Sequence, residues 1–122
     1  MCDKFSEKSC IILHQLAEVI EQRRQNLPMD SYTTSLFLGG IEKIVAKFSE
    51  ESEELIEVIV ASIPGNDALL NNEQITHEAA DLMYHFLVLL ASCNVTLRDV
   101  EQELARRFGV SGLAEKTARD KA

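Results

Sequence analysis

The sequence has little positive charge, and this shortage excludes two classes of protein. Its 122 residues carry 12 Lys and Arg against 20 Asp and Glu, which gives a formal net charge of −8. Nucleic-acid binding calls for a basic face, and attraction to an anionic membrane surface calls for clustered basic residues. We therefore expect no nucleic-acid partner and no membrane partner.

Paired cysteines and long apolar runs are also missing. Cys2, Cys10 and Cys93 are odd in number and form neither a C-x-x-C pair nor a metal-finger spacing, which indicates free thiols in a reducing compartment. The charged start MCDKFSEKSC does not resemble a secretory signal, and the longest apolar run, residues 86–91, is far shorter than a membrane span. These absences favour a cytoplasmic protein.

Strand patterns are absent too, and proline occurs only twice. The length suits a single domain over residues 1–122, in which 106–122 reads as a polar C-terminal tail. Apolar residues recur instead with the 3.6-residue period of helices. The predicted fold is an all-α bundle of four to five helices. A third long helix that is apolar nearly all round needs cover on every side, and this need favours completion of the bundle by a homodimer.

The expected helices can be placed by their end signals. The periodicity predicts a first helix over about 6–26 and a second over about 34–62, with a bend at Gly39-Gly40. After the turn IPGND, where Asn66 and Asp67 are cap candidates, a short helical piece leads into an apolar helix that ends near residue 93. Thr96 and Asp99 resemble a capping box that opens a last helix, which Gly109 ends.

Two acidic residues interrupt the most apolar of these helices. Glu78 and Asp81 lie at i and i+3 in HEAADLMYHFLVLL, beside residues that should be buried. Carboxylates are almost never fully buried unless something pairs with them. A lone buried acid would instead raise its pKa and lose its charge. The helix therefore contains a feature that packing alone does not explain.

A second acidic pair, Glu51 and Glu54, lies on the preceding helix in EESEELIE. On a helical wheel Glu51 falls at the edge of the expected core face. That face comprises Ile41, Ile44, Phe48, Leu55 and Ile59. For this helix alone, a solvated acidic face is an equally good interpretation, because charge runs on helices are usually exposed.

Taken together, E-x-x-E followed by E-x-x-D predicts a site for a hard divalent cation. Mg²⁺ prefers oxygen ligands in near-octahedral geometry, which two facing helices can supply from Glu51, Glu54, Glu78 and Asp81. A di-iron site would call for Glu-x-x-His pairs, which the chain lacks. His85 is better explained as a hydrogen-bonded core histidine than as a catalytic one. His14 and His77 are expected at the surface and Tyr84 in packing.

Lys47 and Lys43 precede the acids by one and two turns, respectively, on the same side of the helix. Such lysines could hold phosphate oxygens while Mg²⁺ bridges the phosphates and activates a water. Gly39-Gly40 lacks the Lys-Ser/Thr that a P-loop requires. Hydrolysis of a phosphoanhydride on a helical bundle is the hypothesis that follows from the residues alone.

Longer motifs indicate which class of phosphoanhydride hydrolase the chain resembles. The segments SYTTSLFLGGIEKIVAKFSEESEELIEVIVAS, HEAADLMYHFLVLLA and LRDVEQELARRFGVSGLAEKTAR cover most of the region from Ser31 to Arg119. They resemble the phosphoribosyl-ATP pyrophosphohydrolases of the all-α NTP pyrophosphohydrolase (MazG-like) superfamily. The acid pairs occur throughout that superfamily. Four other motifs favour this one family over its relatives: the S-Y-T opening, the K-x-x-x-K, the D-L-x-Y-H run and the S-G-x-x-E-K tail.

The resemblance implies Mg²⁺-dependent cleavage of phosphoribosyl-ATP to phosphoribosyl-AMP and pyrophosphate, the second step of histidine biosynthesis, by a homodimer. It also suggests an association of the chain with the next enzyme of the pathway. By the match of motifs, Glu51, Glu54, Glu78 and Asp81 correspond to the metal ligands, and Glu50 and Glu51 to the groups that orient or deprotonate the attacking water. The residues implied on the substrate or phosphate side are Lys43, Lys47, Ser31, Tyr32 and Thr33.

Two other hypotheses compete with this one. The chain could be a housekeeping nucleoside triphosphate pyrophosphatase of the same superfamily, against which the narrow motifs count. It could instead be a non-catalytic helical scaffold, but unpaired carboxylates in the apolar helix would then be costly.

Overall fold

The computed structural model describes residues 4–63 and 68–108, which form five helices and no strand. In chain order they are α1 (Lys4–Asn26), α2 (Tyr32–Gly39), α3 (Ile41–Ser62), α4 (Ala68–Ser92) and α5 (Leu97–Phe108). The all-α prediction is confirmed. The predicted caps Asn66 and Asp67, the end at Gly109 and the tail beyond it lie outside the described residues.

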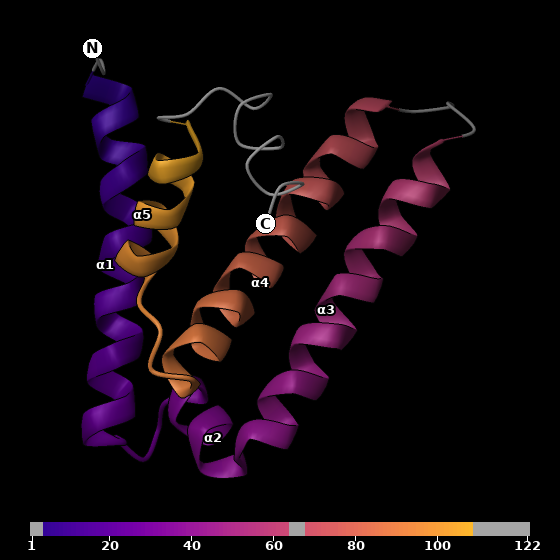
Figure 1. Cartoon of the computed structure of the whole chain (residues 1–122). Coiled ribbons are helices and arrows are strands. Elements are labelled where there is room, and N and C mark those ends of the chain that lie inside the picture. The colour runs from indigo at the N-terminus through magenta and orange to yellow at the C-terminus, as the bar shows by residue number, and fades with distance from the viewer. Residues whose placement is uncertain (1–3, 64–67, 109–122) are drawn as a thin grey trace, which may run out of the picture.

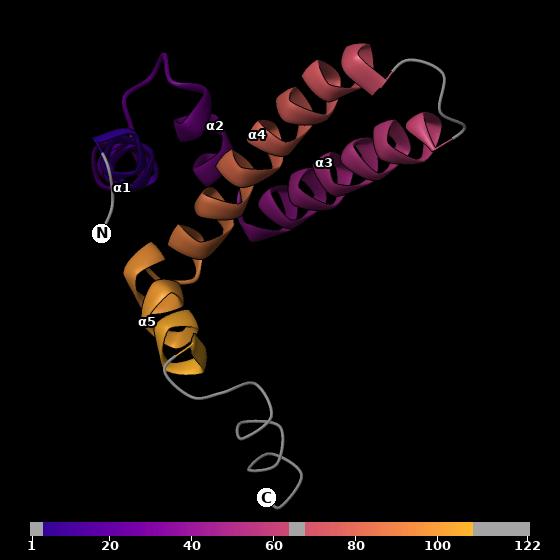
Figure 2. The same cartoon turned by 90° about the horizontal axis from the view of Figure 1, so that it is seen from above.

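The α3 and α4 helices form a long antiparallel pair, and α4 lies between α1 and α3 in both views (Figures 1 and 2). The core lies where α1, α2 and the start of α3 meet the second half of α4. Its buried side chains are Ile20, Leu36, Ile44, Leu87 and Val88. Phe48 and Phe86 extend the contact between α3 and α4, with ring centroids 6.1 Å apart.

The expected bend at Gly39-Gly40 is a break between two helices. Gly40 has φ 87° and ψ 171°, a conformation that side-chain-bearing residues rarely adopt. Its N–H closes α2 on the carbonyl of Phe37, and its carbonyl accepts the N–H of Ile44, which starts α3. The predicted helix over 34–62 was therefore wrong in its continuity. Ser31 caps the new start, because its Oγ accepts the N–H of Thr34 at 3.3 Å.

The α4 helix is continuous over the stretch where a separate short helical piece was expected, since no Gly or Pro interrupts residues 68–92. It ends close to the predicted residue 93. Asn94 adopts φ 59°, and the N–H groups of Asn94 and Val95 bond to the carbonyls of Ala91 and Leu90. These bonds form a Schellman motif with Asn at the left-handed position.

The predicted capping box at α5 is confirmed. The N–H of Asp99 donates to Thr96 Oγ1 at 3.0 Å, and the N–H of Thr96 donates to Asp99 Oδ2 at 2.9 Å. The helix extends to Phe108, so residues 106–108 of the predicted tail are helical. The first half of α5 is anchored near α1 by a hydrogen bond between His14 Nε2 and Glu101 Oε2 at 2.9 Å.

One part of the predicted core face of α3 was wrong. Ile44 is buried, and Phe48 and Leu55 are partly buried, but Ile41 is 48% exposed and Ile59 is 41% exposed. Both lie about 60° from Ile44 around the helix. Because α4 covers only one side of α3, none of the other described helices buries this flank.

In the described residues no single helix has both the length and the apolarity to cross a membrane. One bent pair, residues 72–92 with Leu97–Phe108 at 103°, passes that test jointly, on length and composition alone.

Candidate metal-binding active site

The facing sides of α3 and α4 bring three of the four predicted metal ligands together. Glu51 and Glu54 come from the middle of α3, and Glu78 comes from the first half of α4. One carboxylate oxygen from each lies within 4.8 Å of the other two. Because the helices are antiparallel neighbours, residues far apart in sequence meet here side by side. Three convergent carboxylates suit a hard divalent cation.

Asp81 belongs to a second group that overlaps the first. Ligand atoms of His77, Glu78 and Asp81 also lie within 4.8 Å of one another, so Glu78 is common to both groups. His77 Nε2 lies 3.4 Å from Asp81 Oδ2, although the side chain of His77 is 73% exposed. The fourth predicted ligand is thus one helical turn away from Glu78, beside a histidine.

Burial leaves the acid cluster short of partners. Glu51 is only 7% exposed, and the Oε2 atoms of Glu51 and Glu78 are buried without a hydrogen-bond partner among the described residues. Burial raises the pKa of Glu51, and the adjacent Glu54 carboxylate raises it further. The pKa of Glu78 is raised by the same two causes and by Asp81. The residues fit a cation, because a cation would satisfy the orphaned oxygens and remove the repulsion between carboxylates.

Lys47 lies beside the cluster, and Lys43 does not. Lys47 Nζ donates to Glu50 Oε2 at 3.2 Å and lies 3.7 Å from Glu51 Oε1. These acids, with Glu50 first, raise the pKa of Lys47 and keep its ammonium charged. Lys43 is exposed and bonds the backbone carbonyl of Ser35 at 3.4 Å. Of these two lysines, Lys47 is therefore the one placed to meet a phosphate near the carboxylates.

The S-Y-T motif divides into two structural residues and one exposed residue. The Ser31 side chain caps α2, as described above. Thr33 is buried, and its Oγ1 bonds the hydroxyl of Tyr84 at 2.5 Å, which gives Tyr84 the packing role expected for it. Tyr32 is 53% exposed and is the member of the motif most open to a ligand.

The predictions for the remaining histidines are confirmed. His85 is 6% exposed and is hydrogen-bonded on both ring nitrogens, as a core histidine should be. His14 is partly exposed and forms the hydrogen bond with Glu101. His77 is exposed, as predicted, but its closeness to Asp81 was not expected, although it lies four residues before Asp81 and next to Glu78.

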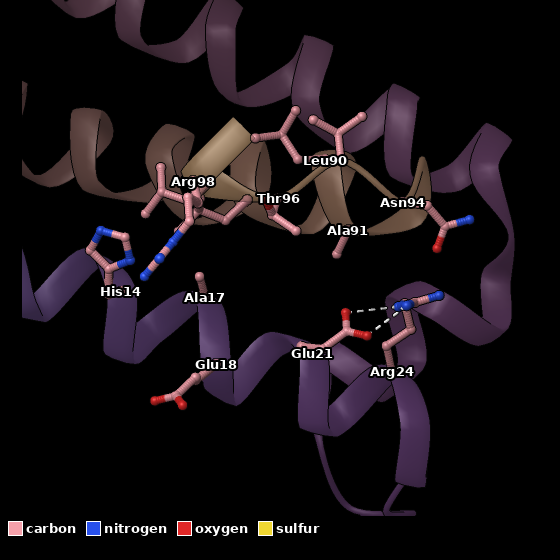
Figure 3. Close-up of a pocket in the computed structure, with 13 residues that line it drawn as sticks. His14, Ala17, Glu18, Glu21, Arg24, Leu90, Ala91, Asn94, Thr96 and Arg98 are labelled. Atoms are coloured by element: carbon pink, nitrogen blue, oxygen red, sulfur yellow. Dashed lines mark hydrogen bonds and ion pairs between the residues drawn. The ribbon is translucent and has the colours of Figure 1, made fainter. Parts of the chain in front are cut away.

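A cavity of about 350 Å³ lies elsewhere, between α1 and the corner of α4 and α5 (Figure 3). Its floor is apolar, with Leu90 and Ala91 among the lining residues. Glu21 on its rim holds Arg24 through two hydrogen bonds, at 2.9 and 2.6 Å. None of the predicted site residues lines this cavity, so it is separate from the carboxylate cluster.

A model of the family "Phosphoribosyl-ATP pyrophosphohydrolase" matches residues 13–108. The chain belongs to this family. The match spans both helices of the carboxylate cluster, the S-Y-T motif and His85. It confirms the resemblance that the motifs indicated.

Curated members of the phosphoribosyl-ATP pyrophosphohydrolase family align along nearly their full length. A protein of Ruegeria pomeroyi is 47% identical over 110 residues, which cover 90% of this chain and 97% of the relative. One of Geobacter sulfurreducens is 47% identical over 109 residues, 89% of this chain and 94% of the relative. One of Paracoccus denitrificans is 46% identical over 107 residues, 88% and 92% of the two chains. All three are named phosphoribosyl-ATP pyrophosphatase.

Proposed function

We propose that this chain hydrolyses phosphoribosyl-ATP to phosphoribosyl-AMP and pyrophosphate in histidine biosynthesis, with Mg²⁺ held by Glu51, Glu54, Glu78 and Asp81. Family membership and the names of the relatives support the reaction. The assignment of a metal site rests on two buried carboxylate oxygens, one on each facing helix, that have no hydrogen-bond partner among the described residues. A scaffold would have no reason to retain them, since removing such charges usually stabilises a fold.

The residues around the cluster would have separate roles in the reaction. When bound, Mg²⁺ would neutralise phosphate charge and lower the pKa of a water. Lys47, held between Glu50 and Glu51, would bind phosphate oxygens on the flank of the cluster. Glu50 is exposed on that flank and would accept the proton of the attacking water. The water oxygen then bonds to the α-phosphorus, the bond to the bridging oxygen breaks, and pyrophosphate leaves.

The proposal includes a homodimer. Apolar side chains are exposed along one flank of α3, at the end of α2 and just after α3. They are Ile41, Val45, Ile56, Ile59 and Val60 on the flank, with Leu38 in α2 and Ile63 after α3. A second copy would cover them. The cytoplasmic location and the association with the next pathway enzyme stay predictions.

The decisive experiment measures pyrophosphate release from phosphoribosyl-ATP, ATP and dCTP, with Mg²⁺ and with EDTA. Release from phosphoribosyl-ATP alone, and only with the metal, is the expected result. Release from ATP and dCTP instead would make the chain a housekeeping pyrophosphatase with the same site. Metal-independent release would contradict the Mg²⁺ assignment, and no release from any substrate would contradict the proposed hydrolysis.

A further inference from the structure

Both ring nitrogens of the buried His85 have defined partners. Its Nδ1 lies 2.8 Å from the backbone carbonyl oxygen of Asp81, and its Nε2 lies 3.4 Å from the hydroxyl of Tyr32. Asp81 is one of the proposed metal ligands, and Tyr32 is the exposed member of the S-Y-T motif. The imidazole therefore connects the backbone of the metal site with a side chain at its rim.

The first of these contacts determines the tautomer of His85. A backbone carbonyl can only accept a hydrogen bond, so the hydrogen between Nδ1 and Asp81 belongs to Nδ1. In a neutral imidazole the other nitrogen, Nε2, then carries a lone pair and can only accept. The hydroxyl of Tyr32 consequently donates its hydrogen to Nε2.

Packing holds the imidazole in this orientation. The ring of Tyr84 lies edge-on to His85, with centroids 4.9 Å apart and an interplanar angle of 85°. Tyr84 is itself held by its bond to Thr33, and its ring stacks on Tyr32 at 6.3 Å. A flip of the imidazole would break its hydrogen bond to the Asp81 carbonyl. Because His85 is only 6% exposed, that loss would be costly.

The direction of the Tyr32 hydrogen bond decides what Tyr32 can offer a ligand. Once its hydrogen is donated to His85, the phenol oxygen presents only lone pairs. Tyr32 is 53% exposed and its hydroxyl lies 3.4 Å from Nε2 of His85, so a ligand at the proposed site can reach its oxygen. A fully ionised phosphate has no hydrogen to donate to this oxygen, whereas a sugar hydroxyl has one.

We propose that His85 is a positioning residue that orients the Tyr32 hydroxyl, so that the phenol oxygen accepts a hydrogen bond from a ribose hydroxyl of the substrate. This inference rests on the proposed function, since it assigns a substrate contact within that reaction. It also revises the expected role of Tyr32, which then binds sugar and not phosphate.

The tautomer can be tested without turnover. ¹⁵N NMR of histidine-labelled, metal-free protein near pH 8 distinguishes protonated from bare ring nitrogens, and comparison with His85→Gln assigns the signals of His85. We expect hydrogen on Nδ1 and a bare Nε2. Hydrogen on Nε2, or on both nitrogens, would overturn the proposal, because Tyr32 would then be the acceptor in their bond.

Kinetics test whether His85 acts through Tyr32. We expect Tyr32→Phe and His85→Asn each to raise KM for phosphoribosyl-ATP roughly tenfold, the usual effect of one lost hydrogen bond, with kcat within about twofold. Asn keeps a donor for the Asp81 carbonyl and has no group that reaches Tyr32. The double variant should be no worse than Tyr32→Phe alone, and His85→Gln, whose amide oxygen reaches the Nε2 position, should recover most of the loss.

The matched control is Ser92→Ala, which removes a hydroxyl that donates to the carbonyl of Leu89 at the end of α4 and should leave KM unchanged. Losses that multiply in the double variant, or an equal loss in the control, would overturn the positioning role. If His85→Asn does not fold, Tyr32→Phe and the NMR result still decide. Failure of wild-type turnover would contradict the proposed function and leave the tautomer result standing.

Discussion

At the scale of single residues, Glu51 shows why a site for function differs from a site for stability. Its carboxylate is buried at the edge of the core, next to a second carboxylate on the same helix, and one oxygen lacks a partner among the described residues. Each of these features costs stability in the absence of a cation. Their combination at one position is what a metal ligand requires and what packing would avoid.

We predict that Glu51→Gln raises the Tm of the metal-free protein by on the order of 5 °C, because it removes a buried charge and keeps the shape. The same variant should lose the stabilisation that Mg²⁺ gives the wild type, which at a hundred times Kd is about 2.7 kcal/mol. Differential scanning calorimetry with and without Mg²⁺ measures both effects. Glu53→Gln, an exposed acid two residues away, is the control. A Mg²⁺ response that survives in Glu51→Gln would contradict the ligand assignment.

The pKa of Glu51 gives a pH dependence with a definite sign. Burial and Glu54 raise it above 4.5, so the folded state binds a proton more tightly than the unfolded state. The resulting stabilisation is fully present below 4.5 and is lost as pH rises through the folded-state pKa. We therefore expect the Tm of metal-free wild type to fall relative to that of Glu51→Gln as pH rises above 4.5.

This Tm difference reports Glu51 together with the carboxylates beside it, because shifted acids elsewhere in the chain are common to both proteins and cancel. The pKa of Glu103, for example, is lowered to about 2 by its hydrogen bond to Arg106 and then by Arg107. Its stabilisation is present above 4.5 and lost as pH falls toward 2, the opposite sign. Parallel Tm curves for the two proteins between pH 4 and 8 would show that Glu51 titrates normally.

At the scale of elements, the ends of the helices follow local rules and their faces do not. The capping box at Thr96, the Ser31 cap and the Asn94 terminus each need only a few neighbouring residues. The buried faces depend on which helix lies opposite. The three acidic positions meet because α3 and α4 run antiparallel at this register, a relation between residues more than twenty positions apart.

We predict that Thr96→Ala destabilises the protein by about 1 kcal/mol, since it removes the oxygen that accepts the N–H of Asp99. Urea unfolding measures the loss, and amide hydrogen exchange should show faster exchange in the first turn of α5. Thr76→Ala, at an exposed position within α4, is the control and should be neutral or slightly stabilising. Equal losses in the two variants would show that the cap contributes nothing.

At the scale of the whole molecule, the two flanks of α3 have opposite character. One flank carries Lys47, Glu50 and Glu54 toward the proposed site. The other carries exposed apolar side chains, including Ile56 at 58% and Val60 at 55% exposure. We proposed this flank as the interface with a second copy of the chain, since exposed apolar patches of this extent are typical of interaction surfaces.

We predict that the wild type sediments as a dimer at micromolar concentration and that Ile56→Glu sediments as a monomer, because a charge in the apolar interface would remain unpaired. Gln15→Glu adds the same charge at an exposed polar position of α1 and should leave the dimer intact. A monomeric wild type would contradict the homodimer, and a dimeric Ile56→Glu would place the interface elsewhere.

Much of this protein could be predicted from the sequence by itself. The helical class, the acidic pairs, the capping box and the family follow from spacings of three to four residues and from short motifs, which are local properties. The helix break at Gly40 was expected only as a bend, because a sequence does not state the φ angle that glycine takes.

Only the tertiary structure decided which of these residues act together. It grouped Glu51 and Glu54 with Glu78, and it placed Asp81 in an overlapping group with Glu78 and His77. It exposed Ile41 and Ile59, turned Lys43 toward Ser35 and joined His85 to Tyr32. The physical reason is that the periodicity of a helix determines its own faces, whereas contacts between helices depend on how those faces are turned and offset against one another in space.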